Sequence, residues 1–93
     1  MNEKKSLIYN KALDILSRRE HSEKELVQKL KNKFVEHDLI DEVTSKLINN
    51  NLLNDLRFAE AYTVSRKRKG FGPKKISFEL QGKGLREKEV ESV

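Results

Sequence analysis

Residues 53–84, LNDLRFAEAYTVSRKRKGFGPKKISFELQGKG, decide the fold because they contain two helix starts and one helix end at close spacing. The spacing predicts a helix over 55–69 that ends at Gly70, a residue suited to the left-handed conformation that stops helices. A second helix then opens at Gly72 and Pro73, because proline lacks the amide hydrogen that has no partner at the first helical position. Gly70, Gly72 and Pro73 are therefore predicted to form a tight turn.

The predicted turn is flanked by cations. Between positions 66 and 75 the sequence has six basic side chains and no acidic one, so we interpret this charge as having no local partner. Such a cluster predicts an anionic or acidic binding partner. The structural alternative is that cations at a helix end only complement its negative dipole. The candidate binding residues, taken from this turn, its first helix and an earlier helix end, are Arg57, Arg66, Lys67, Arg68, Lys74, Lys75, Arg18 and Arg19.

Phe71 stands between the two glycines of the turn and has two interpretations. It can contact a partner, by stacking on a base or by entering an apolar pocket. Alternatively, it packs inward as the apolar residue that precedes a helix cap. We favour the packing role for Phe71.

The rest of the sequence predicts helices as well, so the fold class is all-α. Ser22 and Glu25 fit a capping box, while Asp38 and Asn54 are suitable caps for two later helices. Apolar residues recur at helical spacing, which predicts one buried stripe per helix. The 55–69 helix is predicted to bury Phe58, Ala59, Tyr62 and Ser65. The predicted helices cover 4–18, a segment from 22, then 39–50, 55–69, 73–82 and 85–93.

The two halves of the sequence repeat with an offset of 50 residues. The matched positions are Ile8 and Phe58, Ala12 and Tyr62, Ser22 and Gly72, Leu26 and Ile76, Leu30 and Leu80, Ile40 and Val90, and Val43 and Val93. This pattern predicts a three-helix repeat over 1–53 and a second over 54–93 whose last helix is incomplete. Because repeats bury their apolar faces against neighbours, we expect the natural protein to continue.

Composition and motifs limit the class of protein. The 93 residues include no cysteine, and no apolar run approaches the roughly 18 residues of a membrane span. We therefore expect a small cytoplasmic protein, without membrane contact and monomeric. The net charge of +5 divides into +1 over residues 1–53 and +4 over 54–93.

Catalysis is not indicated. The only histidines are His21, which precedes a cap, and His37, whose acidic neighbours suit a helix start better than a metal site. The glycine turn is too short for the phosphate-binding loop of nucleotide hydrolases, and no nucleophile has a base beside it. We predict no enzyme activity, cofactor or metal.

Two stretches resemble the RecX family of bacterial RecA modulators. Residues 54–84 contain Asn-Asp-Leu-Arg-Phe-Ala-x-x-Tyr-x-x-x-Arg and then Gly-Phe-Gly-Pro-x-x-Ile-x-x-Glu-Leu-x-x-Lys-Gly, a pattern similar to the family's central repeat. Residues 12–30, Ala-Leu-x-x-Leu-x-x-Arg-x-x-Ser-x-x-Glu-Leu-x-x-Lys-Leu, resemble its first repeat. Family members usually have a third repeat, which is absent from this sequence.

The resemblance implies an elongated, curved molecule that lies along the groove of the RecA filament on DNA. It also implies a regulator that modulates RecA ATPase and strand exchange, with the RecA filament as its main partner and DNA as a secondary contact. The alternative is a stand-alone helical DNA-binding module. Its helix from Gly72 offers lysines but no asparagine or glutamine near its start, so it would contact mainly phosphates.

Overall fold

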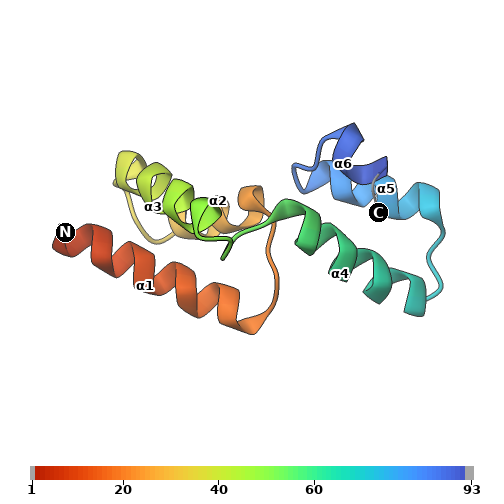
Figure 1. Cartoon of the computed structure of the whole chain (residues 1–93), viewed down its shortest axis with the longest axis horizontal. Helices are drawn as coiled ribbons and strands as arrows, with labels where there is room; N and C mark the ends of the chain where they lie inside the picture. Colours follow the sequence, from red (N-terminus) through yellow and green to blue (C-terminus); the bar gives the residue numbers. More distant parts are fainter. Residues whose placement is uncertain (1, 92–93) are drawn as a thin grey trace.

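The computed structural model describes residues 2–91. They form helices α1 Glu3–Arg18, α2 Glu23–Lys31, α3 His37–Asn49, α4 Asp55–Arg68, α5 Pro73–Gly82 and α6 Glu87–Glu91 (Figure 1). No residue of this range lies in a strand, which confirms the all-α fold class. Within the same range no helix has the length and apolar character needed to cross a membrane.

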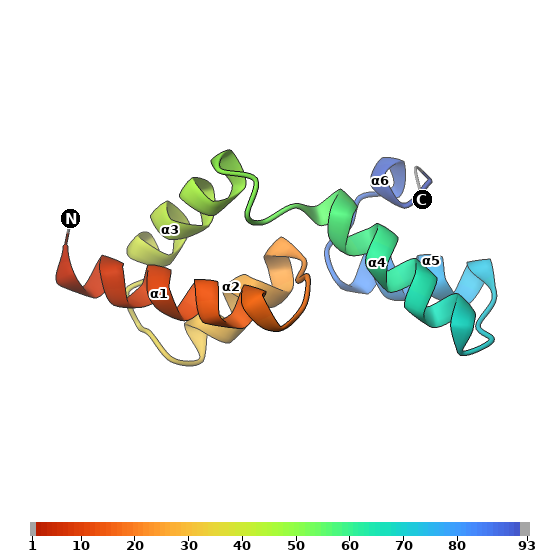
Figure 2. The same cartoon turned by 60° about the horizontal axis from the view of Figure 1, so that its bottom comes forward.

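The helices repeat with the predicted offset of 50 residues. Helices α1 and α4 end at positions 18 and 68, α2 and α5 begin at 23 and 73, and α3 and α6 begin at 37 and 87. The helices of each set pack against one another, so that α1–α3 and α4–α6 are two three-helix units. The units lie end to end in a molecule of 44 × 23 × 23 Å (Figure 2). The tandem, elongated architecture is confirmed.

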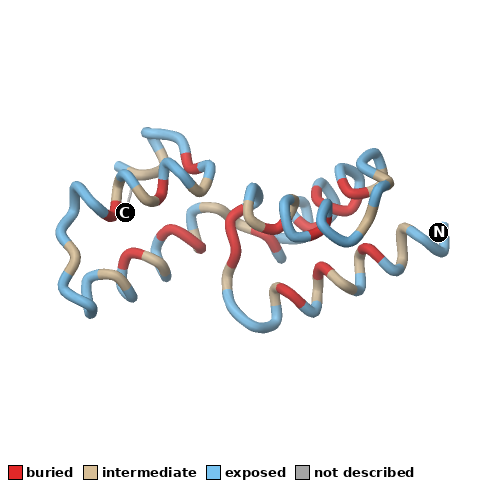
Figure 3. Tube along the Cα trace, turned by 180° about the vertical axis from the view of Figure 1, so that it is seen from behind, coloured by how far each residue is buried: buried red, intermediate tan, exposed pale blue. Residues whose placement is uncertain are grey.

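Each unit has its own apolar core (Figure 3). The first core consists of Ile8, Ala12, Ile15, Leu26, Leu30, Ile40, Val43, Leu47 and Leu53. The second is smaller, with Phe58, Ala59, Ile76, Leu80 and Leu85. Burial of one large aliphatic side chain contributes roughly 1.5–3 kcal/mol, so the first unit has the larger apolar stabilisation. In the matched pair of Val43 and Val93, the second residue lies outside the described range.

Two helix starts follow the predicted caps. The Ser22 hydroxyl accepts a hydrogen bond from the Glu25 amide at 3.2 Å, and the Glu25 carboxylate accepts one from the Ser22 amide at 3.1 Å. This is the predicted capping box of α2. Asn54 caps α4, because its side-chain oxygen accepts a hydrogen bond from the Arg57 amide at 2.9 Å.

The turn between α4 and α5 also has the predicted form. Gly70 has a φ of +91°, a conformation that costs a residue with a Cβ atom roughly 1–2 kcal/mol. Gly72 occupies the cap position of α5, and Pro73 is its first residue. The basic side chains on both sides of this turn are therefore held at one end of the molecule.

The predicted cap of α3 is wrong. The helix begins at His37, before Asp38, and Glu36 takes the cap position without a side-chain hydrogen bond. Asp38 lies in the first turn instead, where its carboxylate still interacts favourably with the positive end of the helix dipole.

The predicted buried stripe of α4 is wrong at one position. Ser65 is exposed, and Thr63 is buried in its place. Helices α5 and α6 cover α4 on the Thr63 side, where Thr63 shares a small cavity with Ile76, Leu80 and Val90. Ser65 lies on the side of α4 that faces the first unit, and the half-buried Tyr62 lies there too.

Candidate binding surface

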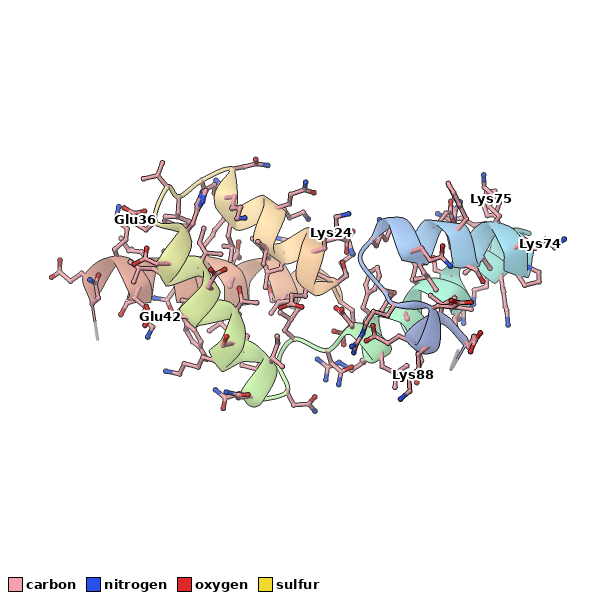
Figure 4. All side chains as sticks on the ribbon, turned by 90° about the horizontal axis from the view of Figure 1, so that it is seen from above. Lys24, Glu36, Glu42, Lys74, Lys75 and Lys88 are labelled. Atoms are coloured by element: carbon pink, nitrogen blue, oxygen red, sulfur yellow. The ribbon has the colours of Figure 1, made fainter. Side chains whose placement is uncertain are left out.

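Several predicted binding residues are exposed cations around the α4–α5 turn. No ion pair among residues 2–91 holds the side chains of Lys67, Arg68 or Lys74. Lys75 is exposed as well, and its Nζ lies 5.5 Å from the centroid of the Phe71 ring. Figure 4 shows Lys74 and Lys75 pointing away from the helices at the end of the molecule. These side chains are available to a partner.

Arg66, in contrast, is paired. Its Nε donates to Oε1 of Glu79 at 3.0 Å, and its second guanidinium nitrogen donates to Oε2 at 2.8 Å. Two parallel charge-assisted hydrogen bonds of this kind fix both side chains. The hydrogen bond from Arg66 lowers the pKa of Glu79. The prediction that the cluster has no local acidic partner is wrong for Arg66, because α5 folds back along α4 and places Glu79 beside it.

Phe71 lies under the Arg66 guanidinium, whose central carbon is 3.7 Å from the ring centroid. The ring is half-buried and packs against the second core. Phe71 thus has packing contacts within the chain, and contact with a partner stays a prediction.

Arg57 connects the two units. Its Nε forms an ion pair with Glu20, which precedes α2. Its other guanidinium nitrogens donate to the carbonyl oxygens of Asn51 at 3.0 Å and Leu52 at 3.3 Å, both in the α3–α4 connection. A single side chain therefore links the first unit, the connecting segment and α4.

Three further contacts complete this polar junction. Lys83 Nζ is 3.1 Å from Glu25 Oε2, and Lys24 Nζ donates to the Gly82 carbonyl at 3.2 Å. Figure 4 shows Lys24 at the end of α2 that faces the second unit. The Asp55 carboxylate accepts a hydrogen bond from the Glu23 amide at 2.7 Å, so a residue of the second unit caps a helix of the first.

Burial and hydrogen bonding shift the pKa values of the junction carboxylates in opposite directions. Burial raises the pKa of Asp55. Burial would also raise the pKa of Glu25, but hydrogen bonds from Arg19, the Ser22 amide and Lys83 outweigh it and lower that pKa to about 2. Glu25 is therefore ionised at neutral pH.

The remaining predicted residues lie at the end of α1. Arg18 is exposed and 3.5 Å from Asp14. Arg19 donates to both carboxylate oxygens of Glu25, at 3.2 and 3.1 Å, and to the Glu20 carbonyl at 2.7 Å. The guanidinium of Arg19 is thus fixed, yet its side chain stays half-exposed.

Two surface grooves meet at Arg19. The first-repeat groove has a volume of about 590 Å³, and its charged residues are Lys11, Asp14, Arg18, Arg19, Lys29 and Lys33. The junction groove has a volume of about 440 Å³, and its charged residues are Arg19, Glu20, Arg66, Lys69 and Lys83. Arg18, Arg19 and Arg66 are therefore brought together along one surface, whereas Lys74 and Lys75 line neither groove.

From the sequence alone, Lys29, Lys31 and Lys33 are interpreted as a solvated helix face, and Lys11 is not singled out. Lys11 and Arg18 are two turns apart on α1, which places them on one helix face. Lys29 lies on α2, and Lys33 lies two residues beyond the end of that helix. Whether the two pairs lie along the same groove depends on how α1 and α2 pack, and local sequence patterns do not show this packing.

His21 lies beneath the first-repeat groove and is only 2% exposed. Its Nδ1 is 2.9 Å from the Arg19 carbonyl, and its Nε2 is 2.8 Å from Lys29 Nζ. A carbonyl only accepts and an ammonium only donates, so Nδ1 carries the hydrogen and Nε2 is the acceptor. Burial lowers the pKa of His21, in agreement with a neutral ring.

Two three-helix units, open charged grooves and an exposed basic turn define an all-helical repeat protein with a largely basic surface around its turn. Residues 9–47 match the first three-helix domain of RecX, and residues 54–93 match the second. The chain belongs to the RecX family of regulatory proteins.

Known proteins agree with this assignment. The regulatory protein RecX of Pseudomonas savastanoi is 38% identical over 80 residues, covering 86% of this chain and 52% of that protein. RecX of Cronobacter sakazakii is 41% identical over 90 residues, covering 86% and 54%. The crystal structure of RecX from Lactobacillus salivarius is 34% identical, with a TM-score of 0.84, and covers 99% of this chain and 60% of that one. The chain spans about half the length of the curated relatives it matches.

Proposed function

We propose that this chain binds the RecA filament on DNA and modulates RecA ATPase and strand exchange without chemistry of its own. The observation that carries this proposal is the match of both three-helix units, in order, to the two RecX domains. A binding protein changes the state of a filament only when it binds one state more tightly than another. The proposal therefore requires contacts that one filament state offers and another does not.

The exposed cations of the α4–α5 turn support such contacts. Lys67, Arg68, Lys74 and Lys75 can meet acidic side chains of RecA or phosphates of the bound DNA. Arg66 and Arg57 have a different role in the proposal, because their intramolecular pairs hold α4 against α5 and against the first unit. In this proposal they position the exposed cations.

The surface of α5 supports regulation over sequence-specific DNA reading. Its first two turns present Lys74, Lys75 and Phe78 to solvent, with Phe78 77% exposed. Bidentate reading of adenine uses an asparagine or glutamine side chain, and these turns contain neither.

RecA-mediated strand exchange, measured with increasing amounts of the chain, tests this function. The unmodified chain should inhibit the reaction. A variant with Arg68, Lys74 and Lys75 changed to Ala should need about tenfold more protein or more, because each lost pair contributes roughly 0.5–1 kcal/mol. The control changes Lys4, Lys31 and Lys46 to Ala, which alters net charge equally outside the turn. Equal inhibition by both variants would refute the assignment of the turn, and no inhibition by the unmodified chain would refute the function.

A further inference from the structure

We propose that the first-repeat groove binds the sugar-phosphate backbone of a single nucleic-acid strand, which continues past Arg19 into the junction groove. This inference rests on the proposed function for its biological role, since it assigns the DNA contact of that function to a specific surface. It concerns Lys11, Lys29 and Lys33, which lie on the opposite side of Arg19 from the α4–α5 turn.

The charge of the first-repeat groove is strongly one-sided. Its lining contains five cations and a single carboxylate, that of Asp14. Asp14 is shared between Lys11 at 3.7 Å and Arg18 at 3.5 Å, both in solvent-exposed pairs that contribute little net stability. A groove lined mainly by one sign of charge concentrates counter-ions of the opposite sign. The groove therefore favours a polyanion.

The cations come from two segments that line the groove. Lys29 lies in the last turn of α2 and Lys33 lies two residues beyond the end of that helix, while Lys11 and Arg18 lie on α1. Several charges spread along a groove suit a polymer that carries one charge per unit better than they suit a lone anion. Phosphodiesters meet this requirement, and each contact releases a condensed counter-ion.

The groove also contains a side chain that holds one of its lysines in place. The buried His21 ring anchors to the Arg19 carbonyl through Nδ1, and its Nε2 accepts a hydrogen bond from Lys29 at 2.8 Å. The ammonium of Lys29 is thus fixed by a neutral acceptor, which leaves its full charge directed at the groove. A carboxylate partner would have cancelled that charge.

The second repeat has a carboxylate at the position that corresponds to Lys29, and this carboxylate neutralises a cation. With the offset of 50 residues, His21 and Lys29 correspond to Phe71 and Glu79. Glu79 neutralises Arg66 there, and the guanidinium covers the Phe71 ring. The two repeats therefore use the same pair of positions differently: in the first repeat this pair holds a cation, and in the second it supplies a carboxylate that neutralises one.

Arg19 lies between the two grooves, because it lines both. Beyond it, Lys69 and Lys83 extend the positive charge into the second repeat. A strand that follows this path would contact both units across their junction. The affinity should then depend on the length of the strand, so that an oligonucleotide that spans both grooves binds more tightly than one that fills only the first.

Fluorescence anisotropy of a labelled, mixed-sequence single-stranded oligonucleotide tests the proposal with the whole chain and no RecA. Changing Lys11 and Lys33 to Gln should raise the Kd on the order of fivefold or more, and lower the slope of log K against log salt by about 1.4, that is about 0.7 per lost contact. The matched control changes Lys31 and Lys46 to Gln and should retain the Kd. Circular dichroism checks that both variants fold.

Equal weakening in the two variants would overturn the groove assignment, as would absence of binding at low salt. An acidic peptide can compete with the labelled oligonucleotide. If it displaces the oligonucleotide at a lower concentration of negative charges than an unlabelled oligonucleotide needs, the nucleic-acid assignment is overturned in favour of a protein partner.

The RecA assay separates the two proposals. Inhibition of RecA without oligonucleotide binding refutes the groove and leaves the proposed function standing, whereas oligonucleotide binding without any effect on RecA supports the groove and refutes the function.

Discussion

Lys83 and Glu25, 58 positions apart in the sequence, form an ion pair of 3.1 Å that joins the two repeats. The other contacts of the junction described above are polar as well, and the two apolar cores share no residue. The relative placement of the repeats therefore depends on charges, whereas the fold of each repeat depends on apolar burial. Salt and pH should affect the first property more than the second.

The junction should open when its ion pairs are removed. Changing Arg57 and Lys83 to Ala removes two of its cations without touching either core, and small-angle scattering should then give a larger radius of gyration than that of the unmodified chain. The unmodified chain should expand as salt is added, because exposed pairs are screened. A variant with Lys31 and Lys46 changed to Ala is the control. Identical scattering from all three proteins at low salt would contradict a polar junction.

Glu25 should make stability depend on acid pH. Its pKa is about 2 in the folded chain against 4.5 for the unperturbed group, so its ionised form stabilises the fold above pH 4.5. This contribution is lost as the pH falls from about 4.5 towards 2. With allowance for solvent screening it amounts to roughly 1–2 kcal/mol.

Urea unfolding of the protein and of Glu25→Gln measures that contribution. The variant should be less stable at pH 7, and the difference should shrink at pH 3 and disappear near pH 2. A difference that stays constant across this range would show that Glu25 does not titrate with a lowered pKa.

Arg66 should act on stability, in contrast to its neighbour Arg68. Arg66→Ala leaves Glu79 without its partner and uncovers the Phe71 ring, and the cation–π contact alone contributes roughly 0.5–1 kcal/mol. Arg68→Ala removes an exposed side chain and should change stability by roughly 0.5 kcal/mol or less. Thermal unfolding compares them. Equal melting temperatures would show that the Arg66 pair does not support the second repeat.

Gly84 should tolerate a side chain less well than Gly82. Gly84 has a φ of +93°, and a Cβ atom there would lie 2.9 Å from Lys24 Cβ in the other repeat. Gly84→Ala therefore adds a clash to the roughly 1–2 kcal/mol of backbone strain. Gly82 is helical with open space around it, so Gly82→Ala should stabilise by roughly 0.5–1 kcal/mol.

Denaturant unfolding of the two variants checks this order, with Gly70→Ala as the third case. Gly70 has a φ of +91°, and a Cβ atom there would meet no neighbouring atom within 4 Å, so its substitution carries strain without a clash. Its cost should lie between those of the other two. Equal costs at Gly70 and Gly84 would show that the approach of Lys24 is not tight.

Local signals made much of the fold predictable. Ser22 with Glu25, Asn54 and the Gly72-Pro73 pair act within three or four residues of themselves, so the sequence alone indicated where helices start. The offset of 50 residues then predicted two similar units. The cap of α3 was less predictable, because that helix starts without any side-chain hydrogen bond.

Local sequence signals do not show whether a given cation is paired with a carboxylate or exposed to a partner. Arg66 and Arg68 are neighbours in one basic run, yet only Arg66 meets a carboxylate, since Glu79 reaches it from α5. Arg57 finds Glu20 across the junction for the same kind of reason. These pairs depend on tertiary packing between helices. The sequence therefore indicates a basic surface, and the structure distinguishes its supporting cations from its available ones.

The most direct test of the central claim is the ATPase rate of RecA on single-stranded DNA, measured while this chain is added. We predict a rate that falls with increasing chain and recovers in the variant with Arg68, Lys74 and Lys75 changed to Ala. A rate that stays unchanged up to saturating chain, with the chain shown to be folded by circular dichroism, would contradict the proposal that it regulates RecA.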